Sequence, residues 1–396
     1  MFSNKNFRSL FFSQAFSLFG SSLSTIAITQ LFFNLSENNV SQNLGIVLVL
    51  KMCVYIIGAP LVHHFLKVFK QKKLMLTFDL VRFFLFLIMV FVAKSWEVYI
   101  LMMFINICSA GFTPIYQFQL SEIFDDKTYT KAVFISKITN NILTVLAPVV
   151  ASILLLFMSS KLLFVINSFT FLISFIFIKN LDDRSTIKKS RSVSNVFQSI
   201  NIFLKNKSLL KVTTLVLISS MLGSIVYIKT ISFIENDFHL SKSYMSLAMA
   251  SYALGIGIVS FLVTLIIKEI NPRRAMILGS VISLCVVLLD TVYFNVYILF
   301  FSWFLFGLSS GLIEGFMQVI LKKEISAIDR HAYLVGYFSI SHLGWLISYF
   351  TVGILLGSMN QETFFITMSF VVFSIFIFYG VISQKSWLRR YLISSL

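Results

Sequence analysis

The stretch KNLDDRSTIKKSRSVSNVFQSINIFLKNKSLLK, residues 179–211, is the only long polar segment of the chain and separates two strongly apolar parts of similar length. It contains eight Lys or Arg residues against two Asp residues. Within it, apolar side chains recur at helical spacing, namely Val193, Val196, Phe197, Ile200, Phe203 and Leu204. This stripe predicts a short amphipathic helix on a membrane surface. A solvated linker is the alternative, which the stripe disfavours.

The composition on either side of this segment is that of a membrane protein. Hydrophobic residues make up 58% of the chain and charged residues 12%, whereas soluble domains are about a quarter charged. Apolar runs recur that are long enough to cross about 30 Å of hydrocarbon. Cys53, Cys108 and Cys285 are scattered within these runs, which predicts neither a disulfide framework nor a metal site. We expect a polytopic protein in the lipid bilayer, without a metal or cofactor.

The apolar runs predict an all-α membrane protein of twelve transmembrane helices. They are expected at Phe7–Asn34, Leu44–Leu66, Leu74–Val92, Trp96–Leu120, Ala132–Phe157, Leu162–Ile178, Leu209–Ile234, Tyr244–Ile267, Ala275–Tyr293, Val296–Leu321, Tyr333–Gly357 and Thr363–Ile382. Strands are disfavoured because an open sheet edge cannot lie in lipid.

Basic residues are distributed very unevenly over the ends of these helices. Of the 32 Lys and Arg residues, 25 lie on one side and three on the other, and four lie inside predicted helices. By the positive-inside rule, both termini and residues 179–211 are cytoplasmic. The net charge of +16 is thereby explained without nucleic acid as a partner. We expect a multi-pass protein of the cell (inner or plasma) membrane.

The two apolar halves repeat each other at an offset of about two hundred residues. Ala110-Gly111 corresponds to Ser310-Gly311, and the turn at Glu122-Ile123 corresponds to Glu324-Ile325. Such internal duplication is typical of transporter folds.

Local motifs then resemble those of a known family. They are Ser13-Gln14 with Ser17–Gly20, Asp79–Arg82, Ala110–Pro114 followed by Glu122, and Ala147-Pro148. Together with six plus six helices and a basic central loop, they resemble the major facilitator superfamily, in particular its macrolide-efflux and enterobactin-exporter-like branch of drug–proton antiporters. The resemblance implies two pseudo-symmetric six-helix bundles, 1–180 and 208–396, joined by a cytoplasmic loop, 181–207.

The chain departs from the family pattern at two places. Ser21 stands where members often carry an acid after the glycine of the first helix. Lys67 and Val68 replace the usual Asp-Arg pair between the second and third helices. The salt-bridge latch of that loop is therefore in doubt.

Glu314 is the predicted proton-coupling residue. It follows Val296 by 18 residues, which places it about 27 Å from the outer end of its helix. The resemblance implies that this helix lines the central cavity. A carboxylate there loses hydration, which disfavours its charged form and suits it to carry a proton. The alternative is an acid fixed by a permanent hydrogen bond where Gly311 and Gly315 allow close packing.

Other charged residues within the predicted helices are interpreted differently. Asp79 and Arg82 are three residues apart and can pair on one helix, and we predict a structural charge pair. Lys137 is expected to snorkel or to contact Asp79.

Lys51 and Lys229 have no acid close in sequence, which suggests a site for an anionic group of the substrate. Tyr55 lies one turn from Lys51, and Tyr227 adjoins Lys229. Snorkelling of both lysines to the outer headgroups is an equally weighted alternative. Asp290 is a possible partner for either.

Amides in helices expected to line the cavity complete the predicted substrate-binding set. They are Gln30, Gln117 and Gln318. Such amides also join helices by hydrogen bonds, which is the more common use.

We therefore predict a secondary transporter, not an enzyme, that exports an amphipathic small molecule by alternating access, driven by proton influx. A siderophore, a metallophore or a drug is the expected substrate, protons are the expected coupling ion, and a monomer is the expected state. A nutrient importer or lipid flippase on the same fold is one alternative, and a transport-inactive scaffold or sensor is another.

Overall fold

The structure is a computed structural model that describes residues 1–35, 40–65, 69–182, 197–240, 243–266, 270–356 and 359–394. Val193 and Val196 of the predicted surface helix, and Lys67 and Val68, lie outside these ranges.

The described part of the chain is helical, without strands, and the predicted fold class is confirmed. Up to the central loop the helices are α1 (Lys5–Leu35), α2 (Val40–Phe65), α3 (Gln71–Ile88) with its 3-10 extension η2 (Met89–Phe91), α4 (Ser95–Ile123), α5 (Asp126–Leu154) and α6 (Ser160–Lys179). After it follow α7 (Gln198–Lys205), α8 (Lys207–Ser224), η3 (Ile225–Lys229), α9 (Thr230–Ser232), η4 (Phe233–Asp237), α10 (Ser243–Ile266), α11 (Pro272–Val292), α12 (Val296–Glu324), α13 (Arg330–Phe350), η5 (Thr351–Leu355) and α14 (Gln361–Ser394). Among the described residues, 11 helices are long and apolar enough to cross a membrane.

Polar caps explain several helix starts. The Asp125 carboxylate accepts a hydrogen bond from the backbone N–H of Thr128, so α5 begins six residues before its predicted start at Ala132. Asn271 caps α11 in the same way, and Pro272 at the first turn suits a helix start because its missing N–H would have no partner there.

The seventh predicted span is helical throughout but not uniform. It consists of α8, the π-helical segments η3 and η4, and the single turn α9 between them. The segment η3 includes Tyr227 and Lys229, two of the predicted site residues. Such π-helical bulges occur frequently at functional sites because they shift the side chains that follow them.

The amphipathic helix predicted in the central segment is present as α7, in the part of that segment that the structure describes. Phe203 is buried, whereas Phe197 and Leu204 are exposed, which fits a short helix with an apolar face.

The chain divides into two compact units. Unit 1 comprises Met1–Ala132, Thr139–Ile202 and Ile325–Leu343, and unit 2 comprises Val133–Ile138, Phe203–Glu324 and Gly344–Leu396. Six residues of α5 therefore belong to unit 2, and the first half of α13 belongs to unit 1. The division predicted from the sequence, at 1–180, 181–207 and 208–396, stays a prediction.

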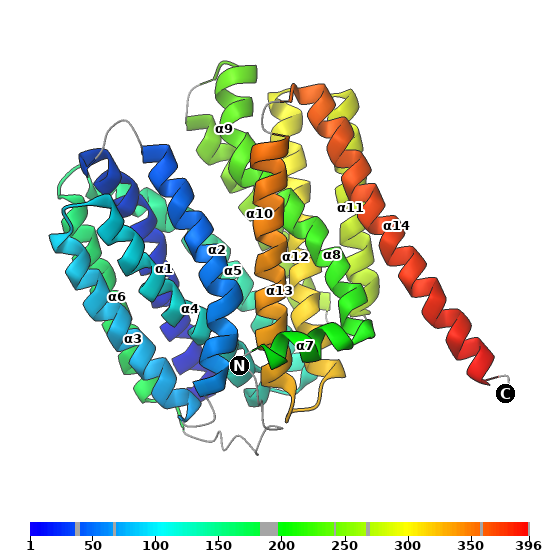
Figure 1. Cartoon of the computed structure of the whole chain (residues 1–396), viewed down its shortest axis with the longest axis horizontal. Coiled ribbons are helices and arrows are strands. Elements are labelled where there is room, and N and C mark those ends of the chain that lie inside the picture. Colours follow the sequence, from blue (N-terminus) through cyan, green and yellow to red (C-terminus); the bar gives the residue numbers. More distant parts are fainter. Residues whose placement is uncertain are drawn as a thin grey trace. The chain divides into compact units, whose positions relative to one another are not determined.

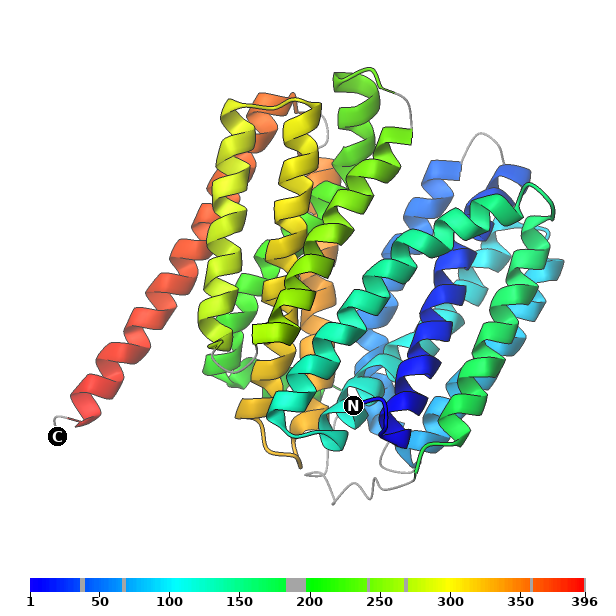
Figure 2. The same ribbon diagram turned by 180° about the vertical axis from the view of Figure 1, so that it is seen from behind.

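Unit 1 is held together by aromatic and aliphatic side chains. In it α6 packs against α1 and α3, and α4 packs against α2 and α3 (Figures 1 and 2). Phe32, Phe86, Phe164 and Phe171 lie fully or almost fully buried in its core. Rings of Phe86 and Phe171 stack with centroids 5.5 Å apart, an arrangement that adds to the stabilisation from burial alone.

Unit 2 is organised around α12, which packs against α8, α10 and α11 (Figure 1). Two glycines allow α10 and α12 to meet at the backbone. A Cβ atom at Gly307 would lie 1.9 Å from the Tyr252 carbonyl oxygen, and one at Gly255 would lie 1.9 Å from that of Phe304. Small residues permit this close approach, which supplies dispersion contacts where lipid removes the hydrophobic driving force.

Candidate functional site

The candidate site is centred on Glu314, in the middle of α12 in unit 2. Its Oε2 atom lies 3.0 Å from the Lys137 ammonium nitrogen, and its Oε1 atom accepts a hydrogen bond of 3.0 Å from the Ser219 hydroxyl. The side chains of Lys137 and Glu314 are 17% and 31% exposed, so the ion pair is partly accessible. The carboxylate therefore has a defined partner on each oxygen and can still be reached from outside the protein.

Glycine and phenylalanine packing brings the two charges together. A Cβ atom at Gly315 would lie 2.5 Å from the Phe134 ring, so this position must be small for α5 to approach α12. Phe134 also meets the Phe316 ring edge-on, with centroids 5.1 Å apart. Lys137 follows Phe134 by three residues and so lies on the same face of α5, from which it reaches Glu314.

Both charges lie deep along their helices. Lys137 is 11 residues from the start of α5 and Glu314 is ten residues from the end of α12, or about 15–17 Å in each case at 1.5 Å per residue. An isolated charge at such a depth is costly, and pairing reduces that cost. Protonation of Glu314 would remove the attraction and leave the ammonium without its counter-charge. The two charges therefore compensate each other within the apolar helices that carry them.

Two tyrosines lie near the carboxylate, and further aromatic rings pack beside one of them. Tyr227 and Tyr252 both lie within electrostatic reach of Glu314. Trp345 lies beside Tyr227 and Tyr349, with ring centroids 6.3 Å and 5.5 Å apart. Tyr227 is 46% exposed although it lies within a long apolar helix. These rings offer an apolar surface next to the ion pair.

The two predicted anion-binding lysines belong to different units. Lys229 is buried in unit 2, where its ammonium nitrogen lies 4.8 Å from the Phe364 ring centroid and 5.6 Å from that of Phe233. Asp237, at the end of η4, interacts with Lys229 electrostatically, a contact that the sequence did not suggest. The faces of aromatic rings attract such a cation and stabilise it. Binding of an anionic substrate group by Lys229 stays a prediction, and snorkelling to the outer headgroups stays its alternative.

Lys51 lies in unit 1 on α2. Its ammonium nitrogen is 5.6 Å from the centroid of the Tyr55 ring. Tyr55 in turn contacts Phe338 and His342 of α13, with ring centroids 5.3 Å and 4.8 Å apart. Tyr55 is therefore part of an aromatic contact with α13.

The three predicted amides have different environments. Gln30 is exposed and donates a hydrogen bond of 3.3 Å to Asn34. Gln117 is half-buried, and its Oε1 atom has no hydrogen-bond partner among the described residues. Gln318 is also half-buried, one turn after Glu314 on α12. Gln318 is thus the amide placed nearest to Glu314 along the helix.

Asp79 and Arg82 form the expected ion pair, completely buried within unit 1. Asp79 also accepts a hydrogen bond of 2.7 Å from Ser174, and Arg82 donates one of 3.2 Å to Ser17. The Arg82 guanidinium carbon lies 4.3 Å from the Phe171 ring centroid. The pair connects three helices of unit 1, α1, α3 and α6.

Sequence reasoning missed the most informative contact of the site. Lys137 was expected to snorkel or to contact Asp79, but it pairs with Glu314. Asp290, considered as a partner for the lysines, instead accepts a hydrogen bond of 2.5 Å from Ser302. Sequence reasoning also missed a pair of histidines, His63 and His331, whose Nδ1 atoms are 2.7 Å apart. A basic residue inside a predicted transmembrane span was the signal that marked Lys137 as unusual. Its partner Glu314 could not be found in this way, because it lies 177 positions away in the sequence.

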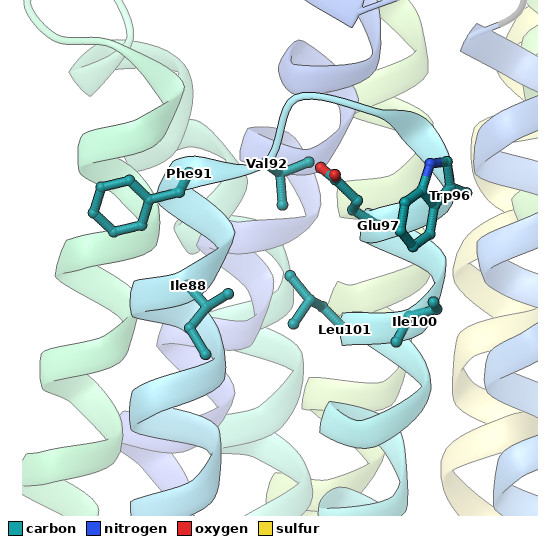
Figure 3. A pocket seen from close by; sticks show the side chains of 7 residues that line it. All are labelled: Ile88, Phe91, Val92, Trp96, Glu97, Ile100 and Leu101. Carbon is teal, nitrogen blue, oxygen red and sulfur yellow. The ribbon is translucent and has the colours of Figure 1, made fainter.

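Unit 1 has an apolar pocket of about 330 Å³ at the connection between η2 and α4 (Figure 3), and none of the predicted site residues lines it. It is lined by Ile88, Phe91, Val92, Trp96, Glu97, Ile100 and Leu101. Glu97 accepts hydrogen bonds from the backbone N–H groups of Ala93 and Lys94, so its carboxylate caps α4. Binding sites usually combine an apolar wall with several convergent polar groups, and this pocket has a single acid that the helix start already uses.

Comparison with known proteins agrees with the helical architecture. The family model of the Major Facilitator Superfamily matches residues 10–228 and 213–387. No curated protein matches the sequence. The chain is similar to the crystal structure of the human organic anion transporter MFSD10 (TETRAN), with a TM-score of 0.80 at 10% identity, over 95% of this chain and 99% of that one. It is also similar to the proton:xylose symporter XylE bound to 6-bromo-6-deoxy-D-glucose, with a TM-score of 0.68 at 12% identity, over 98% and 95% of the two chains. The family model spans both halves of the sequence, and the chain therefore belongs to the major facilitator superfamily.

Proposed function

We propose that this chain exports an amphipathic small molecule in exchange for protons, and that Glu314 carries the proton. Membership of the superfamily supports secondary transport. The observation that carries the proposal is the partly exposed Glu314 carboxylate, deep in α12 and paired with Lys137. A siderophore, a metallophore or a drug fits the aromatic surroundings. Residues 1–180 and 208–396 are proposed as the two moving bundles, with both termini cytoplasmic in the cell membrane.

The ion pair suggests how a proton gradient would drive the cycle. Where the site faces the more acidic side, a proton on Glu314 neutralises the carboxylate and weakens its attraction to Lys137. Where the site faces the cytoplasm, the ammonium of Lys137 favours the ionised acid, and the proton leaves. Because the proton and the substrate use the carboxylate alternately, each turnover exchanges one for the other. Direction is proposed from the resemblance to exporters.

The remaining predicted residues are proposed as substrate contacts. Tyr227 and Gln318 are placed close to Glu314 in the fold or along α12. Lys51, Lys229, Tyr55, Gln30 and Gln117 are proposed to contact the substrate in other steps of the cycle, Lys51 and Lys229 through an anionic group. Asp79 and Arg82 are proposed to be structural.

The test is Glu314→Gln in proteoliposomes with an imposed pH gradient, using an amphipathic fluorescent dye. Glutamine has nearly the same shape but cannot release a proton, so we expect loss of proton-driven dye accumulation against its gradient. Glu362→Gln, an exposed acid in the first turn of α14, is the matched control and should pump normally.

Because Glu314→Gln leaves Lys137 unpaired, the double variant Lys137→Gln/Glu314→Gln guards against a folding defect. If either variant still pumps at the wild-type rate, Glu314 does not carry the proton. Dye that enters together with protons would indicate an importer, movement of a labelled phospholipid a flippase, and absence of any proton-dependent flux a scaffold.

A further inference from the structure

We infer that the Lys137–Glu314 pair is the subsite for a zwitterionic group of the transported molecule, an ammonium and a carboxylate carried on neighbouring atoms. The inference rests on the proposed function and names its substrate class. The two protein charges are 3.0 Å apart, of opposite sign, and both partly exposed. A zwitterion inserted between them gives each protein charge a new partner of opposite sign, and the site stays neutral.

Charge balance separates this class of substrate from simple ions. A cation that pairs with Glu314 displaces Lys137 and leaves an unpaired ammonium deep in the protein. An anion that pairs with Lys137 likewise leaves the Glu314 carboxylate unpaired. Unpaired charges are costly at this depth. A zwitterion avoids both costs because it replaces one ion pair by two.

The neighbouring groups fit the same substrate. Ser219 donates to Oε1 of Glu314 and Lys137 contacts Oε2. The serine can therefore hold the carboxylate in place while the lysine exchanges its partner. Tyr227 lies within electrostatic reach of the carboxylate and packs beside Trp345. An aromatic or extended apolar body attached to the zwitterion would lie against these rings.

The pair also fixes the sign of the coupling. Protonated Glu314 no longer attracts the substrate ammonium, so a proton and a zwitterion compete for the same carboxylate. Competition for one site is what exchange requires. A simple anion would behave in the opposite way, since protonation of Glu314 releases Lys137 and strengthens anion binding. The relative affinities for a zwitterion, a cation and an anion therefore report which class the site accepts.

The experiment compares three probes that share an indole ring. Tryptophan is the zwitterion, tryptamine the cation and N-acetyltryptophan the anion. Binding to the full chain in nanodiscs is measured at pH 7. Wild type should bind tryptophan at least about tenfold more tightly than either other probe, the ratio that one charge-assisted hydrogen bond provides. Glu314→Gln should abolish the preference for tryptophan over N-acetyltryptophan, because the carboxylate that would hold the substrate ammonium is gone.

Lys137→Gln should abolish the preference for tryptophan over tryptamine, while Glu362→Gln should keep it. The charge-reversed double variant Lys137→Glu/Glu314→Lys retains an ion pair for folding and should keep the preference. Equal affinity for the three probes, no binding of any, or tighter binding of N-acetyltryptophan than of tryptophan to the wild type overturns the inference. Proton-driven dye export without a zwitterion preference would refute the inference alone, whereas zwitterion binding without proton coupling would refute the proposed function alone.

Discussion

At the scale of single residues, the two ion pairs within apolar helices differ in how far the solvent can reach them. Asp79 and Arg82 are completely buried, with serine hydroxyls and aromatic faces around them, whereas Lys137 and Glu314 are partly exposed. A charge pair that is enclosed on all sides can change its protonation state only at great cost. The proposed proton carrier, Glu314, belongs to the more accessible of the two pairs.

Replacing Asp79 by Asn should destabilise the protein by about 3–5 kcal/mol, because Arg82 would stay buried without its counter-charge. Thermal unfolding in detergent measures the change. Asp182→Asn is the matched control, since that acid pairs with Lys5 on the surface and both side chains are well exposed. Equal effects of the two substitutions would show that the Asp79–Arg82 pair contributes nothing beyond a surface contact.

The sequence predicts the pairing of Asp79 with Arg82 because spacing along one helix determines it. It identifies Glu314 as unusual because an acid interrupts an apolar run. It does not predict that Lys137 contacts Glu314, because that contact depends on Phe134 packing over Gly315. Such contacts between distant segments arise from side-chain packing in three dimensions, which periodicity does not contain.

At the scale of elements, α2 and α13 meet within unit 1 through two histidines. The rings of His63 and His331 are stacked with centroids 4.8 Å apart, and Phe118 of α4 meets His331 edge-on. Both histidines are 6% exposed. Arg330, adjacent to His331, pairs with Glu122 at the end of α4. One proton between the Nδ1 atoms satisfies the contact, and a second one would set two N–H donors against each other and add a positive charge beside Arg330.

Burial and the neighbouring His63 hold the pKa of His331 well below its ordinary value. Acidification from pH 7 to pH 5 should therefore leave α2 beside the start of α13, and spin labels on the two helices should keep their distance over this range. His331→Phe keeps the ring packing but cannot be protonated, and it should behave like the wild type. His239→Asn is the control, and its backbone with φ of 54° suits asparagine. Labels that move apart in the wild type but not in His331→Phe would show that the histidine pair takes up a second proton in this range.

Most elements follow from hydrophobic periodicity, and their ends are where the sequence-based prediction is weakest. The start of α5 was placed too late because the cap at Asp125 lies in a polar turn that looks like a loop. The π-helical segments η3 and η4 could not be predicted, because they keep the same apolar composition as the helix around them. The local composition determines that a span is helical. Packing determines whether its backbone hydrogen bonds follow the α-helical or the π-helical pattern.

At the scale of the whole molecule, the distribution of basic residues predicts the orientation in the membrane. A reporter fused after Thr186 should be cytoplasmic and one fused after Asn38 external, because Lys and Arg accumulate on the cytoplasmic side. Both positions lie outside the described residues. Alkaline phosphatase and green fluorescent protein fusions give opposite signals on the two sides. An external signal at Thr186 would reverse the orientation of the whole protein.

The exchange of chain segments between the two units has a consequence for the gene. Val133–Ile138 belong to unit 2 although they precede the central polar segment, and Ile325–Leu343 belong to unit 1 although they follow it. A break within residues 179–211 would thus yield two polypeptides, neither of which contains all segments of one unit. Separately translated halves would be obligate partners. Any rearrangement that fused one half to a foreign sequence would have to supply the missing segment again.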